Sequence, residues 1–391
     1  MSDTTISTTR GSASRIEVPG MAPAAGGRLV SLDVFRGLTI AGMLVVNNPG
    51  SWSTIYPPFE HAEWNGWTPT DLIFPFFLFI VGVSMAFSFA KQRERGASEG
   101  AVMKKATIRS LKLWGLGLAL ALFPWWGRTL AHLRIPGVLF RIAVAFFVAS
   151  VLVLWVGRKG RIATTLALLF GYWALQTLVP VPGHGTSQLL PAQDLGSYID
   201  RAVFGTQHLW SQSRTWDPEG LLSTLPAIAN VLLGYFAGEW LRSARTASNK
   251  VRGLFLAGVV AIVLGELWGL VFPINKSLWT SSYAVFTTGM ALVGLALCYW
   301  IIDMKGYRRW AQPFVYLGMN AITAFWLSGL MALTLGRIHV GDTSLHGWIY
   351  STFFTSWLAP MNASLGFALC FLGFWILAMW GFYKKGIFWK V

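Results

Sequence analysis

Long apolar segments separated by short polar ones run along the chain from about residue 31 to its C-terminal end. Most contain about 20 residues, the length that a helix needs to cross the hydrocarbon core of a bilayer. The pattern predicts an all-α polytopic membrane protein with about ten transmembrane helices. We place these spans near residues 31–48, 70–90, 111–126, 137–157, 162–180, 221–241, 253–272, 282–302, 313–335 and 362–383. The segment 348–358 is too short to cross, and we expect an interfacial or half-inserted helix there.

The first 27 residues have a different character, with many Ser, Thr, Gly, Ala and Pro residues and few large apolar side chains. Such a segment buries too little apolar surface to offset the entropy lost on ordering. The sequence therefore predicts a disordered tail at 1–27, followed by one transmembrane domain at 28–391.

Composition agrees with a membrane protein, because 54% of residues are hydrophobic and only 12% are charged. A soluble domain has about a quarter charged residues, so a soluble enzyme and a DNA-binding domain are excluded. The two cysteines, Cys298 and Cys370, lie in apolar segments, which indicates neither a disulfide framework nor a zinc cluster. We expect no metal.

Most of the 31 Lys and Arg residues lie in alternate loops: before the first span, after the second, fourth, sixth and eighth, and after the last. Basic loops face the cytoplasm, so we expect both termini to be cytoplasmic in a cell (inner) membrane. The net charge of +15 then reflects topology, and no nucleic-acid partner is expected.

The first outer loop, 46–75, holds most of the candidate chemistry. His61 offers a general base or nucleophile near neutral pH, and Asp71 offers a carboxylate to orient it. Each residue also has a structural interpretation: a loop histidine is often only solvated, and Asp71 follows Thr68-Pro69 in the pattern of a helix N-terminus. Asn47 and Asn48 end the first span, where Asn-Pro is a common helix stop.

Other ionisable residues are weaker candidates. Asp217 and Glu219 flank a proline before the sixth span, in the pattern of a helix cap. Arg141 lies inside the fourth span and Glu266 inside the seventh, where an unpaired charge is costly. Glu266 either faces a cavity or pairs with a cation such as Arg141 or Lys276. These patterns alone predict a membrane protein with a polar cavity on its outer side.

Several strings carry a more specific signal, and they occur in order over almost all of residues 28–391. The chain resembles the heparan-α-glucosaminide N-acetyltransferase family, particularly its bacterial multi-pass members. The strings are RLVSLDVFRGLTI, FEHAEWNGWTPTDLIFPFFLFIVG, RIPGVLFRIA, WDPEGLLSTLPAIANVLLGYFAG, FPINKSLWTSSY, PFVYLGMNAI and YKKGIFWKV. One departure is Phe140, where the family commonly has Gln.

This resemblance implies a transmembrane enzyme that takes acetyl from cytosolic acetyl-CoA and delivers it to the amine of a terminal glucosamine across the membrane. The family's active-site histidine matches His61, and its companion asparagine and aspartate match Asn47 and Asp71. Whether the histidine carries the acetyl group or only deprotonates the amine stays open. A homodimer is possible.

The remaining site residues are expected by position. For the acceptor we expect contacts from Asn48, Trp64, Asn65, Asp217 and Glu219, and for the coenzyme we expect contacts from Arg36, Arg141, Lys384 and Lys385. Two alternative functions remain open: an amino-sugar transporter, which would use the same cavity as a passage, and an O-acyltransferase, which would act on an envelope glycan.

Overall fold

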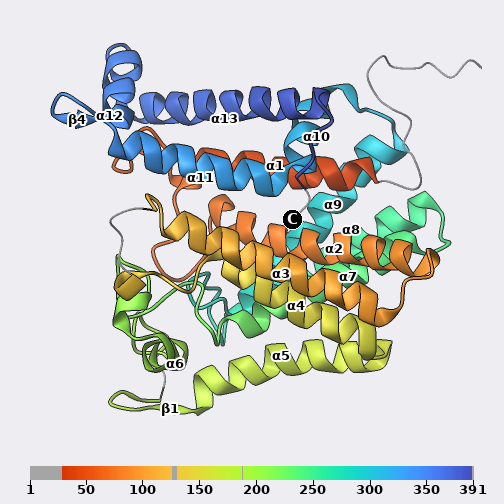
Figure 1. Ribbon diagram of the computed structural model, residues 1–391. Helices are drawn as coiled ribbons and strands as arrows, with labels where there is room; N and C mark the ends of the chain where they lie inside the picture. Colours follow the sequence, from red (N-terminus) through yellow and green to blue (C-terminus); the bar gives the residue numbers. More distant parts are fainter. Residues whose placement is uncertain (1–28, 126–129, 187, 390–391) are drawn as a thin grey trace, which may run out of the picture.

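A computed structural model describes residues 29–125, 130–186 and 188–389, so the expected tail at 1–27 lies outside the described residues (Figure 1). This part of the chain is helical apart from two small antiparallel hairpins, β1 (Pro180–Val181) with β2 (Gly185–Thr186) and β3 (His339–Val340) with β4 (Thr343–Ser344). The helices are α1 (Val30–Val46), α2 (Ile73–Glu94), α3 (Glu99–Ala121), α4 (Val138–Trp155), α5 (Arg158–Leu178), α6 (Leu195–Phe204), α7 (Thr224–Arg242), α8 (Ala247–Gly269), α9 (Ser281–Cys298), α10 (Gln312–Met319), α11 (Ala321–Arg337), α12 (Leu345–Tyr350) and α13 (Pro360–Lys384).

Each expected span overlaps a helix, and the chain is a multi-pass membrane protein. Within the residues that the structure describes, five helices are long and apolar enough to cross a bilayer by themselves, and a bent pair, α10 with α11, would make a sixth. The five are Pro69–Glu94, Val138–Trp155, Ala247–Gly269, Ser281–Met304 and Pro360–Lys384. The segment expected to be interfacial forms α12 and a short π-helical turn, Ser351–Thr355.

Two expected spans are wrong in detail. The third helix begins at Glu99, well before residue 111, because Ser98 caps it by accepting a hydrogen bond from Ala101 N at 3.2 Å and the helix continues through a basic stretch. The ninth span is two helices that meet at an angle of 74°. The segments on both sides of the break are apolar and together long enough for one span, so mean hydropathy gives no sign of it.

The break between α10 and α11 lies at Asn320, whose buried side chain binds the C-terminal segment. Asn320 Nδ2 donates to Ile387 O and its Oδ1 accepts from Trp389 N, both at 3.3 Å. The rings of Trp389 and Trp326 lie 6.2 Å apart. The segment after α13 therefore folds back against the broken helix, which supplies partners for polar groups that a break would otherwise leave unpaired.

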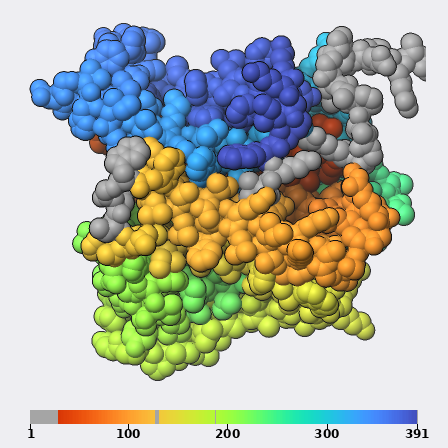
Figure 2. Space-filling view, viewed as in Figure 1, coloured from red at the N-terminus to blue at the C-terminus, as the bar shows by residue number. Residues whose placement is uncertain are grey.

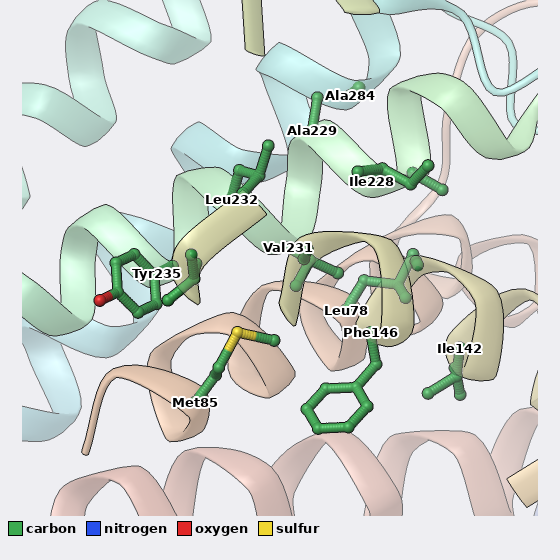
Figure 3. Close-up of a cluster of buried hydrophobic side chains, with 14 of the residues drawn as sticks. Leu78, Met85, Ile142, Phe146, Ile228, Ala229, Val231, Leu232, Tyr235 and Ala284 are labelled. Atoms are coloured by element: carbon green, nitrogen blue, oxygen red, sulfur yellow. The ribbon is translucent and has the colours of Figure 1, made fainter. Parts of the chain in front are cut away.

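The helices pack in layers, with α13, α1 and α11 on one side, α2, α3, α4 and α7 in the middle and α5 beyond them (Figure 1). The space-filling view shows the C-terminal helices in blue opposite α5 and α6 in yellow-green (Figure 2). Leu78 and Met85 of α2, Phe146 of α4 and Val231 of α7 meet in the buried core of the middle layer (Figure 3).

Glycines bring α2 and α7 into close contact. A Cβ at Gly82 would lie 1.9 Å from Val231 O, and one at Gly234 would lie 2.1 Å from Phe79 O. Any side chain at these two positions would push the backbones apart. Small residues serve this purpose in membrane helices, where close packing replaces the hydrophobic driving force. This contact fixes α2, which directly follows the turn Pro69–Leu72 that carries Asp71.

Candidate active site

His61 and Asp71 form a hydrogen-bonded pair at one end of the bundle, where α1 ends and α2 begins; we call this the site end. His61 Nδ1 lies 2.6 Å from Asp71 Oδ1. The side chain of His61 is 50% exposed, whereas that of Asp71 is 1% exposed. A buried carboxylate on one ring nitrogen fixes the orientation of an imidazole and holds the proton on that nitrogen. Nε2 then carries the lone pair.

The other oxygen of Asp71 organises the backbone. Asp71 Oδ2 accepts hydrogen bonds from Thr68 N at 3.0 Å and from Ala62 N at 3.1 Å. Thr68 therefore precedes the 3₁₀ turn Pro69–Leu72 in a capping arrangement, and the bond to Ala62 places the residue next to His61. One carboxylate oxygen of Asp71 thus caps the turn, and the other contacts His61.

Lys276 is the residue that sequence reasoning missed. Its Nζ lies 2.9 Å from His61 Nδ1, 3.1 Å from His61 Nε2 and 3.4 Å from Asp71 Oδ1. Burial lowers the pKa of Lys276 from its ordinary value, although the Asp71 carboxylate opposes the shift. The pairing with Glu266 that the sequence allowed does not form, because Glu266 is exposed on α8.

The loop between α8 and α9 places Lys276. Asn275 Oδ1 accepts from Leu278 N at 2.8 Å, and Asn275 N donates to Thr280 Oγ1 at 3.1 Å. Asn275 Nδ2 also donates to Asn65 Oδ1 at 3.1 Å, which joins this loop to the loop that carries His61. The sequence did contain one signal: Lys276 is a lysine in an expected outer loop, on the face where few basic residues were expected.

A cavity of about 190 Å³ extends from His61 into the bundle. His61, Asn47, Lys276 and Glu219 lie along it, and the rest of its wall is mostly apolar side chains of α1, α2, α4 and α11. The apolar members include Ile40, Met43, Phe77, Ile142 and Phe325. The structure thus brings Asn47 to the same cavity as His61, with a narrow apolar space behind them.

Three of the residues expected to bind the acceptor have partners within the protein. Asn48 Nδ2 donates to Leu44 O at 2.9 Å, which ends α1. Trp64 Nε1 donates to Leu189 O at 2.8 Å, and its ring meets Trp216 edge to face at 5.2 Å. Together with the bond of Asn65 to Asn275, these contacts hold the loop around His61.

Asp217 and Glu219 share Arg134. Arg134 donates through Nε to Asp217 Oδ2 at 2.8 Å and through Nη2 to Asp217 Oδ1 at 2.6 Å and to Glu219 Oε2 at 2.5 Å. Burial alone would lower the pKa of Arg134, but the larger combined effect of the Glu219 and Asp217 carboxylates raises it. The expected helix cap is wrong, since α7 begins only at Thr224. Asp217 is fully buried, whereas Glu219 lies on the cavity wall.

A further buried carboxylate, Asp200, lies beside this group. Its Oδ1 accepts from Leu221 N at 2.8 Å, at the turn after Asp217. Burial raises the pKa of Asp200 to about 7; that hydrogen bond opposes the shift, and the nearby charges of Asp217 and Asp194 add to it.

The residues expected to bind the coenzyme are not together. Arg36 lies deep along α1 and donates to Ser84 Oγ at 2.6 Å, to Gly318 O at 3.2 Å and to Asp33 Oδ1 at 3.3 Å. Arg109 of α3 lies near enough for the two positive charges to repel each other. Lys384 and Lys385 are exposed at the end of α13, with Lys384 Nζ 4.1 Å from the centre of the Trp380 ring.

Arg141 of α4, also expected to bind the coenzyme, lies inside the bundle next to the turn before α7. Its side chain is completely buried, donates to Gly220 O at 3.2 Å and to Ser223 Oγ, and lies over the Trp279 ring. It therefore holds the turn before α7 and has no surface to offer to a coenzyme. In the described residues, no group of three or more His, Cys, Asp and Glu side chains has the geometry of a metal site.

The sequence of the chain is similar to that of known proteins from one family. Residues 28–267 match the family model described as heparan-alpha-glucosaminide N-acetyltransferase, catalytic. The human heparan-alpha-glucosaminide N-acetyltransferase is 30% identical over 425 residues, and the mouse protein of the same name is 30% identical over 420 residues. Each alignment covers 93% of this chain and 60% of the relative, so the chain spans about three fifths of the length of these curated relatives.

Proposed function

Because the chain belongs to the heparan-α-glucosaminide N-acetyltransferase family, we propose that it is a transmembrane acetyltransferase centred on His61. It would move an acetyl group from cytoplasmic acetyl-CoA to the amine of a glucosamine-type acceptor on the other side of the membrane. The observation that carries the proposal is the Asp71–His61 pair at the mouth of a narrow apolar cavity. It combines an oriented base with a space for an acyl donor.

Asp71 and His61 would supply the reactive group. With its proton on Nδ1 and shared with Asp71, the imidazole presents the Nε2 lone pair. Nε2 either attacks the thioester carbonyl or removes a proton from the acceptor amine, and both steps suit a neutral histidine. In the first route, Nε2 attacks the carbonyl carbon, the C–S bond breaks with its electron pair on sulfur, coenzyme A leaves as its thiolate, and the acetyl group remains on Nε2. The amine then takes the acetyl group, and its proton leaves through the imidazole.

Lys276 and Asn47 would stabilise the charge that develops on the carbonyl oxygen. The ammonium group lies 3.1 Å from Nε2, so it is next to any atom that Nε2 attacks. The Asn47 side chain faces the same cavity from the end of α1. Donors placed where negative charge forms, in a site that excludes water, typically contribute about 2.7–4 kcal/mol each to the transition state.

The donor would reach His61 from inside the bundle. Arg36 and Asn47 are about 16 Å apart along α1 at 1.5 Å per residue, a separation that an extended pantetheine arm can bridge. Arg36, with Arg109 beside it, would hold the coenzyme's phosphates, since guanidinium groups bind phosphate in pairs of hydrogen bonds. The exposed Lys384 and Lys385 would add positive charge at the entrance.

This path requires the topology that the basic loops predict. All ten helical segments would cross the cell (inner) membrane, with both termini in the cytoplasm and the site end on the opposite side. The loop with Trp64 and Asn65, between α1 and α2, and the loop with Glu219, between α6 and α7, would then face the acceptor. A hydroxyl acceptor on an envelope glycan would use the same residues, and an amino-sugar transporter would use the cavity without chemistry.

Acetylation of glucosamine by purified protein in lipid nanodiscs tests the proposal. We expect wild-type protein to form N-acetylglucosamine from acetyl-CoA and His61→Ala to form none. His339→Ala, on the hairpin of β3 and β4, is the matched control and should keep full activity. Equal product from wild type and His61→Ala would contradict the assignment.

A further inference from the structure

A second and larger cavity lies beside the candidate site. Its volume is about 760 Å³, within the range of cavities that bind organic ligands. The walls are formed by α3, α4, α11 and the segment 206–214. Most of the side chains inside it are apolar, among them Trp114, Leu118, Phe140, Phe325 and Leu333. Water filling such a space would leave this surface unfavourably hydrated.

This lateral cavity shares a wall with the cavity at His61. Val138, Leu139 and Phe325 line both. An ion pair also connects the walls of the two cavities, because Arg134 lines the lateral cavity and its partner Glu219 lines the cavity at His61. A molecule held in the lateral cavity is therefore separated from the cavity at His61 by these shared side chains.

Among the described residues, the guanidinium groups of Arg214 and Arg337 lie at the site end of the lateral cavity. Arg337 donates to Leu333 O at 3.2 Å and to Phe123 O at 3.0 Å, and it lies over the Phe123 ring. Arg214 is exposed at the opposite wall. Within the described parts of the chain, neither forms an ion pair with a carboxylate, whereas Arg134 is paired with two. The positive charges of Arg214 and Arg337 are therefore available to bind an anion.

We propose that the lateral cavity binds the anchor of a lipid-linked acceptor: an amino sugar joined through phosphate to a hydrocarbon chain. The chain would lie between α3, α4 and α11, and the phosphate would lie at Arg214 and Arg337. The sugar would then extend past Arg134 to His61. This inference rests on the proposed acetyltransferase and names the class of its acceptor. A free sugar would leave both the apolar wall and the two arginines unused.

Two acceptors distinguish the possibilities: free glucosamine and farnesyl-phosphoryl-glucosamine, each given to the full chain in nanodiscs with acetyl-CoA. We expect kcat/KM at least about tenfold higher for the lipid-linked sugar, because phosphate–arginine contacts and hydrocarbon burial add binding energy. The double variant Arg214→Gln/Arg337→Gln should lose most of this preference through KM and leave turnover of free glucosamine unchanged. Arg245→Gln, an exposed arginine after α7, is the matched control.

The results separate the inference from the function on which it rests. Equal use of both acceptors by wild type would overturn the inference while leaving the acetyltransferase intact. The inference is also overturned if the double variant lowers the acetylation rates of both acceptors equally. It is overturned as well if phosphatidylglycerol inhibits acetylation of the lipid-linked sugar as strongly as farnesyl phosphate does, because the cavity would then be a site for bulk lipid. Acetylation of neither acceptor would overturn the proposed function and this inference with it.

Discussion

Replacing Asp71 with asparagine separates the two tasks of this side chain. The amide oxygen of asparagine can occupy the position of Oδ2 and still accept from Thr68 N and Ala62 N, which keeps the loop folded. The amide nitrogen then takes the place of Oδ1, 2.6 Å from His61 Nδ1. Since that nitrogen donates, Nδ1 must become the acceptor and the imidazole proton must move to Nε2.

The expected loss of turnover in Asp71→Asn follows from these contacts. The lost bond is charge-assisted, and such bonds contribute about 1.5–3 kcal/mol, which corresponds to a rate reduction of roughly 10- to 150-fold. The tautomer change also removes the lone pair from Nε2, an effect that lowers turnover by ~10⁴-fold in a serine protease with the same Asp–His arrangement. We therefore expect kcat to fall by about 10² to 10⁴ with little change in the KM for acetyl-CoA.

The assay is initial-rate acetylation of glucosamine in nanodiscs, with thermal unfolding measured on the same preparations. Asp342→Asn, the same substitution in the exposed turn between β3 and β4, should match wild type in both measurements. A kcat for Asp71→Asn within threefold of wild type, with an unchanged melting temperature, would refute the argument that this carboxylate sets the protonation of His61.

Three further predictions concern residues around the candidate site and in the helix packing that supports it. Burial lowers the pKa of Lys276, so this lysine loses its proton at a lower pH than an ordinary lysine and kcat should fall on the alkaline side of its pH profile. Lys276→Arg should move that fall to higher pH. An unchanged profile would contradict a stabilising role for the positive charge of Lys276. The pKa of Asp200 is raised to about 7, so its stabilising contribution is full below about pH 4 and is lost as the pH rises to 7. Asp200→Asn should therefore raise the melting temperature relative to wild type at pH 8 more than at pH 5, and an equal difference at both pH values would be inconsistent with a protonated carboxyl. Gly82→Ala should lower the melting temperature by several degrees because its Cβ would lie 1.9 Å from a carbonyl of α7, whereas Gly373→Ala on α13, where a Cβ meets nothing within 4 Å, should have no effect.

The helical fold was largely predictable because membrane spans leave a strong local signal. Apolar segments placed the helices to within a few residues at most positions, with α4 and α13 as clear examples. The break at Asn320 was not predictable, because the residues on both sides are equally apolar. Its cause lies almost 70 residues away, in the backbone of Ile387 and Trp389.

The candidate site was predictable where its residues are close in sequence. His61 and Asp71 lie ten positions apart in one motif, and the structure brings them together. Lys276 lies 215 positions from His61, and only folding of the α8–α9 loop reveals the contact. Arg141 shows another gap: the sequence placed it inside a span, but it did not show that the side chain is completely buried and donates through Nη2 to Gly220 O and Ser223 Oγ.

The central claim is that acetyl passes across the membrane through His61, and sealed vesicles test it most directly. Labelled acetyl-CoA is placed on the side of the basic loops and glucosamine on the other, and labelled N-acetylglucosamine is measured for wild type and His61→Ala. The account predicts product on the glucosamine side from wild type alone, with no passage of acetyl-CoA. Product formed equally by His61→Ala, or passage of unmodified glucosamine through both proteins without acetylation, would contradict it.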